Sequence, residues 1–206
     1  MYKGNLVCLR LLEPGDYELT YKWRNDDMYQ KYIFASFNFN SKELEKNWVV
    51  HYSTHDRTDV YLAICLVEND DMIGWYSINN IDHRNRNCHC GGIVIGDKRY
   101  RDGIAYQEAG KFAFDFVINE LNMNRVTGSC FFEHIMSRAQ MEAKFWKLED
   151  VERQALYKNG NYHDICHHAI LKNHLQNGDY EENLIIRRAA KRIKELRQEL
   201  KTTKNI

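Results

Sequence analysis

The sequence predicts a mixed α/β fold of the α+β kind, in which a mostly antiparallel sheet is flanked by helices. Hydrophobic residues make up 44% of its 206 residues and there is one proline, so the chain is long and apolar enough to bury a core. Short β-branched and aromatic runs alternate with segments whose apolar residues recur at helical spacing. Their order is strand, helix, helix, three strands, helix, strand, helix and two strands, which indicates a mixed sheet and not an all-helical bundle.

The N-terminal third predicts one strand and two helices. Residues 5–12 alternate loosely between apolar and polar side chains and stop at a Pro-Gly turn, which is typical of a strand. Asp16 is placed to cap a helix over residues 17–25, and Ser41 is placed to cap a second helix. We expect an aromatic loop between these helices, at residues 29–40.

The middle of the chain predicts a hairpin, a strand and a long helix. Residues 60–67 and 72–79 are β-branched or aromatic runs separated by a short acidic turn. The strand at residues 88–95 contains Gly91 and Gly92, which predict a bulge or a close backbone approach. The helix that follows has one apolar stripe, formed by Ala105, Ala109, Phe112, Ala113, Phe116, Val117 and Leu121.

The C-terminal third predicts a strand at residues 125–132, a helix at 134–146 and two strands joined by Asn159 and Gly160, a strong hairpin signal. A last helix is expected over residues 181–201. We therefore expect one domain over residues 1–173 and a basic helical extension over residues 174–206.

The last helix leaves three arrangements open: pairing with its copy in a second subunit, folding back on the domain, or a solvated basic tail. Residues 181–206 hold eight Lys or Arg against four Asp or Glu, a net charge of +4. Three heptads are too few to support a coiled coil alone. We favour an oligomer contact, and hence a homo-oligomer, over RNA or an acidic partner.

Charge and apolar patterning exclude several classes of partner. Lys plus Arg and Asp plus Glu each number 29, so no global charge predicts a nucleic-acid partner. No apolar stretch approaches the roughly 18–20 residues that span a bilayer, and the first residues lack the apolar segment of a signal peptide. Six scattered cysteines suit reduced, buried thiols. We expect a cytoplasmic protein without a membrane partner.

The segment at residues 95–109 lies between the glycine-containing strand and the long helix. It resembles the acetyl-coenzyme A loop of the GNAT superfamily of N-acetyltransferases, whose signature is Arg/Gln-x-x-Gly-x-Gly/Ala. A turn of small residues at a helix start exposes backbone N–H groups that, with the helix dipole, bind pyrophosphate. The resemblance continues to the subgroup of ribosomal-protein, spermidine and nucleotide-amino-sugar acetyltransferases. It is carried by residues 9–12, 23–26, 120–126, 134–137, 142–146 and 157–164.

This resemblance implies the GNAT fold, with a splayed central strand pair, and an acyltransferase that moves acetyl from acetyl-coenzyme A, its cosubstrate, to a primary amine. The acceptor is an amino-sugar nucleotide, a polyamine or a protein N-terminus. It implies backbone contacts of the coenzyme's pantetheine arm with the strand that ends at Ile95. The implied coenzyme-binding residues are Val94, Ile95, Arg101, Asp102, Gly103, Ile104, Ala105, His134 and Ser137.

The sequence departs from the family pattern at several of these positions. Matching Arg101 to the signature arginine puts Ile104 at a glycine position, whereas matching Gly103 and Ala105 to the small residues puts Tyr100 at the Arg/Gln position. His134, Met141 and Phe145 replace a coenzyme-contacting asparagine, a general-acid tyrosine and a glycine. These departures favour an alternative hypothesis, a catalytically degenerate binding or assembly module.

His89 falls at the position of a family glutamate that acts as base, and an imidazole can deprotonate an amine near neutral pH. The alternative is a structural strand residue. The departing coenzyme thiolate needs a proton, and Cys130, His134, Tyr162 and water are the candidate donors left open. Trp23, Tyr76 and Tyr162 are candidate acceptor contacts among the aromatic residues. No metal is expected, because the His and Cys residues at 88–90 and 163–168 lack the spacing of a zinc site.

Overall fold

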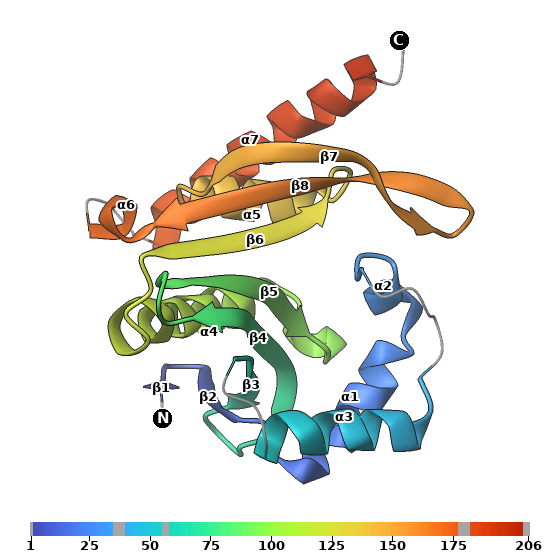
Figure 1. Ribbon diagram of the computed structural model, residues 1–206, viewed down its shortest axis with the longest axis vertical. Helices are drawn as coiled ribbons and strands as arrows, with labels where there is room; N and C mark the ends of the chain where they lie inside the picture. The colour runs from blue at the N-terminus through green and yellow to red at the C-terminus, as the bar shows by residue number, and fades with distance from the viewer. Residues whose placement is uncertain (1, 35–39, 55–57, 177–181, 204–206) are drawn as a thin grey trace. The chain divides into compact units, whose positions relative to one another are not determined.

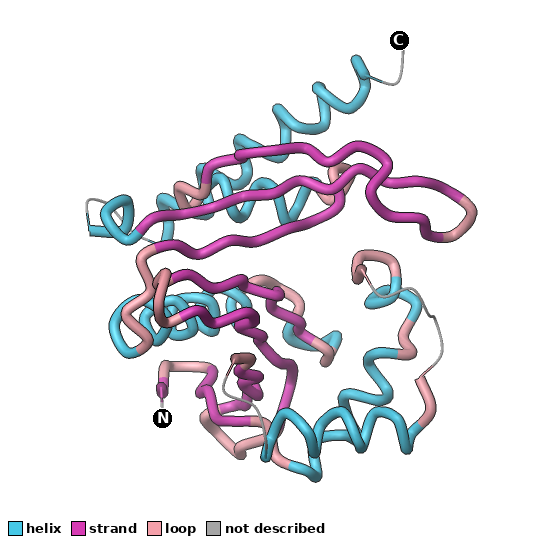
Figure 2. Tube along the Cα trace, in the orientation of Figure 1, coloured by secondary structure: helices cyan, strands magenta, loops and turns pink. Residues whose placement is uncertain are grey.

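The computed structural model describes residues 2–34, 40–54, 58–176 and 182–203. The chain divides into two compact units, Met1–Met123 and Asn124–Ile206. Each unit combines strands with helices (Figure 2), which confirms the mixed α/β prediction. The expected boundary after residue 173 falls within a short helix and stays a prediction.

The first unit contains an antiparallel sheet in the order β1-β2-β3-β4-β5 (Figure 1). Its buried cluster lies on one face of β2, β3 and β4, where cross-strand neighbours such as Ala63 and Trp75 are both nearly inaccessible. The strands are β1 (Tyr2–Lys3), β2 (Val7–Leu11), β3 (Val60–Leu66), β4 (Met72–Asp82) and β5 (Asn87–Ile95).

The expected role of Asp16 as a helix cap is wrong. Its buried carboxylate accepts two hydrogen bonds from the Arg10 guanidinium, at 2.8 and 2.9 Å, and one from the Glu13 N–H at 2.8 Å. Helix α1 (Tyr17–Arg24) therefore begins without a side-chain cap. The predicted cap at Ser41 is confirmed, because its Oγ accepts from the Leu44 N–H at 3.1 Å at the start of α3 (Lys42–Thr54).

The expected aromatic loop begins with a helical turn instead. Helix α2 (Asp27–Gln30) contains Tyr29, and the Asp26 side chain accepts from the Met28 N–H at 3.0 Å. An aspartate at the N-cap satisfies an N–H that has no partner inside the helix, which explains why helix starts here. The stretch 35–39 of the expected loop lies outside the described residues.

Helix α4 (Ile104–Asp115) packs against β2 and β5 through its small side chains Ala105, Ala109 and Ala113. A π-helical turn, Phe116–Glu120, extends it. The Glu108 carboxylate accepts hydrogen bonds from three consecutive backbone N–H groups, those of residues 5, 6 and 7, at 2.6, 2.9 and 2.7 Å. Glu108 thus attaches the helix to the first strands of the sheet, a role that sequence periodicity did not indicate.

The second unit contains an antiparallel sheet in the order β6-β8-β7. The predicted hairpin is confirmed, because Asn159 and Gly160 both have positive φ, at 50° and 81°, as a tight hairpin turn requires. Its elements are β6 (Arg125–Phe131), α5 (Ile135–Ala143), β7 (Lys147–Lys158), β8 (Asn161–Leu171), α6 (Lys172–Gln176) and α7 (Glu182–Thr203).

Helix α5 is shorter than the expected 134–146. Phe145 has a positive φ of 66°, so the chain leaves the helix there and enters β7 after Trp146. Helix α7 folds back and packs on α5, where Ile185 and Ala189 contact Ala143. Of the three arrangements left open by the sequence, the structure shows the intramolecular one, and oligomerisation stays a prediction.

Candidate functional site

The candidate site in the first unit lies where β5 ends and α4 begins. The N–H groups of Gly96 and Asp97 both donate to the Ile73 carbonyl, at 2.8 and 3.0 Å, which closes the strand. The Asp97 carboxylate then accepts from the Arg99 N–H at 3.0 Å and starts a 3-10 turn, Lys98–Tyr100. This short loop delivers the chain to the N-terminus of α4.

The start of α4 is an open helix N-terminus. Its N-cap, Gly103, has a φ of 100°, which residues with a Cβ rarely adopt. Apart from its chain neighbours, no described residue has an atom within 4 Å of the place where a Cβ would be. Ala105 is fully buried, whereas Ile104 is 55% exposed. The Asp102 carboxylate accepts from the Ile104 N–H at 2.9 Å. The first-turn N–H groups that could bind an anion therefore lie beside one negative side chain.

Arg101 connects this loop to the end of β5. Its Nε donates to the Ile95 carbonyl at 2.8 Å and its Nη2 donates to the Gly96 carbonyl at 3.0 Å. These carbonyls follow the last strand pairing, in which Val94 and Ile95 lie opposite Trp75 and Gly74. The Arg101 guanidinium therefore supports the loop, and it brings a positive charge to the strand end.

Both features predicted at Gly91 and Gly92, a bulge and a close backbone approach, are confirmed. The register passes from Ser77 opposite Gly92 to Ile78 opposite Cys90, so Gly91 is the extra residue of a bulge. A Cβ at Gly91 would lie 2.2 Å from both the Ser77 Oγ and the Asn79 Oδ1. Only a glycine lets these two oxygens approach the β5 backbone.

His89 is half-buried on β5, two residues before the bulge and directly opposite Asn79. The Asn79 amide donates to the Tyr61 hydroxyl at 3.1 Å. Burial raises the pKa of Tyr61, so this hydroxyl is neutral at physiological pH. His89 thus lies beside neutral polar groups, and sequence patterning did not indicate Asn79 or Tyr61.

Tyr76 is 4% exposed, and its hydroxyl donates to the Cys90 Sγ at 2.6 Å. Burial raises the pKa of Tyr76 well above its ordinary value and that of Cys90 to about 12. Both groups therefore keep their protons at neutral pH. The acceptor contact expected of Tyr76 stays a prediction, and its hydroxyl is already engaged with Cys90.

Trp23 lies against the loop that ends β5. A Cβ at Gly96 would be 2.0 Å from the Trp23 ring, and this ring stacks on Trp75 with centroids 5.9 Å apart. The structure therefore brings Trp23 and the loop residues together, as a shared site requires. The same end of α1 holds an ion pair that the sequence did not indicate, between Arg24 and the buried Glu45 at 3.0 Å.

The remaining expected site residues belong to the second unit. His134 immediately precedes α5, and Ser137, in its first turn, hydrogen-bonds to Cys130. Burial raises the pKa of Cys130 to about 12, so its thiol stays protonated. Tyr162 is 65% exposed in the β7–β8 hairpin, beside Tyr157. Within this unit, His134 and Ser137 lie together at the start of α5, and Tyr162 lies on the hairpin.

In the described part of the chain, no group of three or more His, Cys, Asp or Glu side chains is placed to hold a metal ion. No helix there is both long and apolar enough to cross a membrane.

Comparisons with known proteins agree with this geometry. A family model described as the acetyltransferase (GNAT) domain matches residues 7–143. The Bacillus subtilis protein named "Putative ribosomal N-acetyltransferase YdaF" is 25% identical over 169 residues, which cover 81% of this chain and 91% of that protein.

Solved structures show the same fold. The spermidine N-acetyltransferase from Vibrio cholerae, in complex with CoA and spermine, matches with a TM-score of 0.75 at 20% identity over 83% of this chain and 98% of its own. A GNAT-family acetyltransferase from Bacillus anthracis matches with a TM-score of 0.71 at 19% identity over 84% and 98%. The family match covers more than half of the sequence, and the structural matches extend over most of it. The chain therefore belongs to the GNAT acetyltransferase family.

Proposed function

We propose that the protein transfers acetyl from acetyl-coenzyme A to a primary amine by direct attack. The observation that carries this proposal is the open N-terminus of α4 beside the end of β5, with Gly103 as its positive-φ N-cap. Proteins of this family use acetyl-coenzyme A, and a helix start of this kind is suited to the coenzyme's pyrophosphate.

The loop geometry favours one of the two ways of matching the family signature. Gly103 and Ala105 occupy positions where the structure demands small residues, because one has a positive φ and the other is fully buried. Tyr100 then takes the Arg/Gln position, and Arg101 supports the strand end through its two carbonyl contacts. In this proposal the pantetheine arm pairs with the end of β5, and the backbone N–H of Val94 or Ile95 donates to the oxyanion that forms at the thioester carbonyl. His134 and Ser137 are proposed as further coenzyme contacts.

In the proposed reaction, an imidazole nitrogen of His89 takes a proton from the ammonium form of the acceptor. The neutral amine nitrogen then attacks the thioester carbonyl carbon, the C–S bond breaks, and the nitrogen loses its second proton as the amide forms while the leaving coenzyme thiolate gains one. Direct attack is preferred because a nucleophilic cysteine must be a thiolate. Burial raises the pKa of all six thiols, for example to about 12 at Cys65 and to about 11 at Cys166, which opposes an acetyl-cysteine intermediate.

The acceptor is one of three classes of amine: an amino-sugar nucleotide, a polyamine or a protein N-terminus. The Vibrio cholerae relative was crystallised with spermine, whereas the Bacillus subtilis relative carries a ribosomal name. Trp23 and Tyr162 are the proposed acceptor contacts, because Trp23 packs against the loop and Tyr162 is exposed. A cytoplasmic homo-oligomer is part of the same proposal.

Calorimetric titration with acetyl-coenzyme A, compared with coenzyme A, tests the coenzyme site. Thiol release with spermidine, an amino-sugar nucleotide and a peptide with a free N-terminus then tests the reaction. We expect micromolar binding and release with one acceptor class, and loss of the low-pH arm of the rate profile in His89→Ala. Absence of binding up to millimolar coenzyme would favour the degenerate binding module instead.

A further inference from the structure

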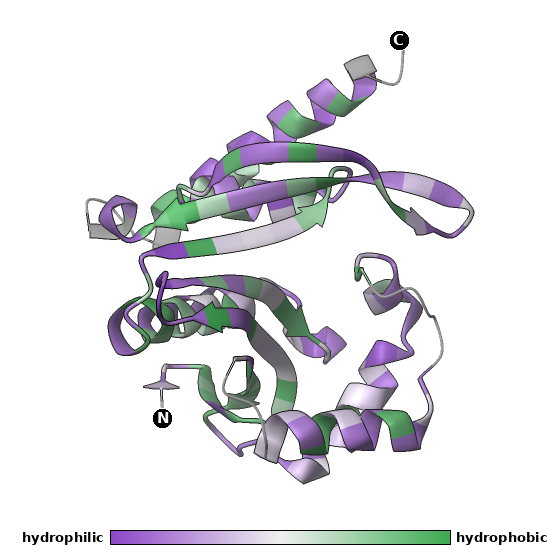
Figure 3. Ribbon diagram, viewed as in Figure 1, coloured by the Kyte–Doolittle hydropathy of each residue, from purple (hydrophilic) through white to green (hydrophobic). Residues whose placement is uncertain are grey.

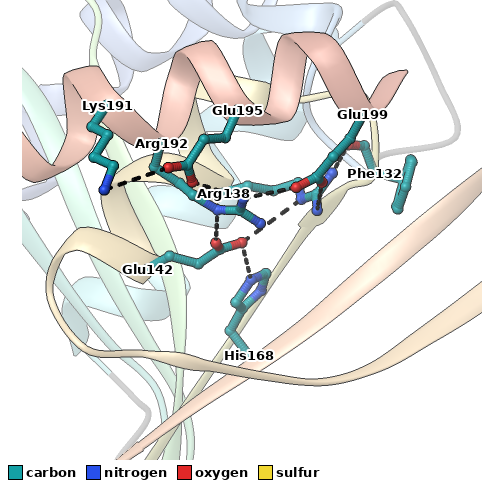
Figure 4. A network of polar contacts seen from close by, with 8 residues as sticks. All are labelled: Phe132, Arg138, Glu142, His168, Lys191, Arg192, Glu195 and Glu199. Carbon is teal, nitrogen blue, oxygen red and sulfur yellow. Dashed lines mark hydrogen bonds and ion pairs between the residues drawn. The ribbon is translucent and has the colours of Figure 1, made fainter. Parts of the chain in front are cut away.

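The charges of α7 are sorted between its two sides. Between residues 184 and 201 the sequence contains seven Lys or Arg and only two acidic residues, Glu195 and Glu199. Both acids accept from the Arg192 guanidinium, at 3.2 and 2.8 Å (Figure 4). Glu199 also lies 3.9 Å from Arg138 of α5. The acidic groups of this part of α7 are therefore engaged on the side that faces α5.

A buried network fixes this orientation of the helix about its axis. Glu142 of α5 forms an ion pair with Arg192 and lies 3.5 Å from His168 of β8. Arg138 is 2% exposed and donates to the Phe132 carbonyl at 3.1 Å. The apolar residues Ile185, Ala189 and Leu196 are buried on the same side. Rotation of α7 would break these contacts, so its opposite side stays directed to solvent.

That outer side carries a row of exposed cations, here called the basic stripe: Arg187, Lys191, Lys194, Arg197 and Lys201. Spacings of four, three, three and four residues place them on one helix face. At about 1.5 Å per residue, the row is about 21 Å long. Lys191 is 81% exposed and lies 3.9 Å from Glu195, and no ion pair is found for the other four among the described residues. Figure 3 shows the hydrophilic character of most of α7.

We infer that the basic stripe binds the phosphate backbone of a nucleic-acid duplex. A duplex presents one negative charge for about every 1.7 Å of its axis, and cations that replace its counterions gain affinity from their release. A straight row of cations on a rigid helix complements this dense, regular charge. The zero net charge of the whole chain does not oppose such contact, because Glu195 and Glu199 are both engaged with Arg192 and residues 181–206 carry +4.

The chemistry of the stripe favours a duplex over other polyanions. An interfacial membrane helix buries its apolar face in lipid, but Ile185, Ala189 and Leu196 of α7 are already buried on their own chain. Single strands bind through aromatic stacking, and residues 184–201 contain no aromatic residue. A protein–protein interface depends on a few tightly packed, desolvated anchor residues, whereas the basic stripe is a row of five exposed cations.

The test is fluorescence anisotropy of a labelled DNA duplex of about 24 base pairs, titrated with the full chain between about 50 and 200 mM salt. The variant is K191Q/K194Q/R197Q. Its matched control is K3Q/R84Q/K111Q, which removes the same charge from exposed residues of the first unit. We expect binding to weaken about tenfold or more at low salt in the stripe variant, and the logarithmic salt slope to fall by about 2.7, or 0.9 per lost contact.

The control variant should bind within about threefold of the natural chain, because its three charges do not belong to the stripe. Circular dichroism should show unchanged helix content in both variants, since all six side chains are exposed. Absence of binding by the natural chain at about 50 mM salt would overturn the inference, as would equal losses in the two variants. Preference for phosphatidylserine vesicles or for an acidic peptide over the duplex would overturn it too.

Discussion

Asp102→Asn should tighten coenzyme binding. The Asp102 carboxylate accepts from the Ile104 N–H at 2.9 Å, so it occupies the helix start where the proposed pyrophosphate must lie. A phosphate on the neighbouring first-turn N–H groups would be roughly two hydrogen-bond lengths away, or about 6 Å. Asparagine keeps the hydrogen-bond acceptor and removes the charge.

The magnitude follows from Coulomb's law. Two unit charges about 6 Å apart repel by about 0.7 kcal/mol in a water-like medium and by about 2.8 kcal/mol at an effective dielectric constant of about 20. Asp102 is exposed, so the lower value applies to each of the two phosphate charges. Removing about 1.4 kcal/mol of repulsion corresponds to about tenfold tighter binding.

The assay is calorimetric titration with coenzyme A at low and high salt, and the gain should shrink at high salt because the carboxylate is screened. Asp115→Asn is the matched control, since it removes the same charge at the other end of α4, about 17 Å along the helix. An unchanged or weaker affinity in Asp102→Asn would refute the placement of the pyrophosphate. An equal gain in affinity in Asp115→Asn would show that the effect comes from the net charge of the protein and not from the position of Asp102.

Three further changes test the packing within the two units, each by thermal unfolding followed by circular dichroism. Glu108→Ala removes the acceptor of three N–H groups at residues 5–7, two of which are partly buried. We therefore expect the free energy of unfolding to fall by about 3 kcal/mol, or Tm by about 6–12 °C, and a smaller loss in Glu108→Gln. An unchanged Tm would show that water replaces the carboxylate. Gly91→Ala places a Cβ 2.2 Å from two side-chain oxygens and should cost about 1–3 kcal/mol, whereas Gly15→Ala, with nothing within 4 Å, should be close to neutral; equal effects would contradict the close approach. Burial lowers the pKa of Lys144 to about 8, below its unfolded value, so keeping this side chain protonated destabilises the folded state below about pH 8. This destabilisation fades as the pH rises toward about 10.5, the pKa in the unfolded chain. Lys144→Met should therefore raise Tm at pH 7 and have less effect at pH 10, and a gain in Tm independent of pH would exclude this cause.

Patterns within short segments determined much of this protein from the sequence alone. The Asn159-Gly160 turn, the Ser41 cap and the bulge at Gly91 were predicted because each depends on the backbone preference of one or two residues. The family resemblance at residues 95–109 was predicted because the loop, its glycine and the helix after it are contiguous.

Only the tertiary structure decided how charged and polar side chains are paired. Asp16 pairs with Arg10 instead of capping a helix, and Glu108 binds N–H groups about a hundred residues away in sequence. Likewise, Glu195 and Glu199 of α7 pair with Arg192, which also contacts Glu142 of α5, whereas the basic stripe stays exposed. A carboxylate satisfies whichever donors the fold brings within about 3 Å, and a sequence does not specify which distant donors those are.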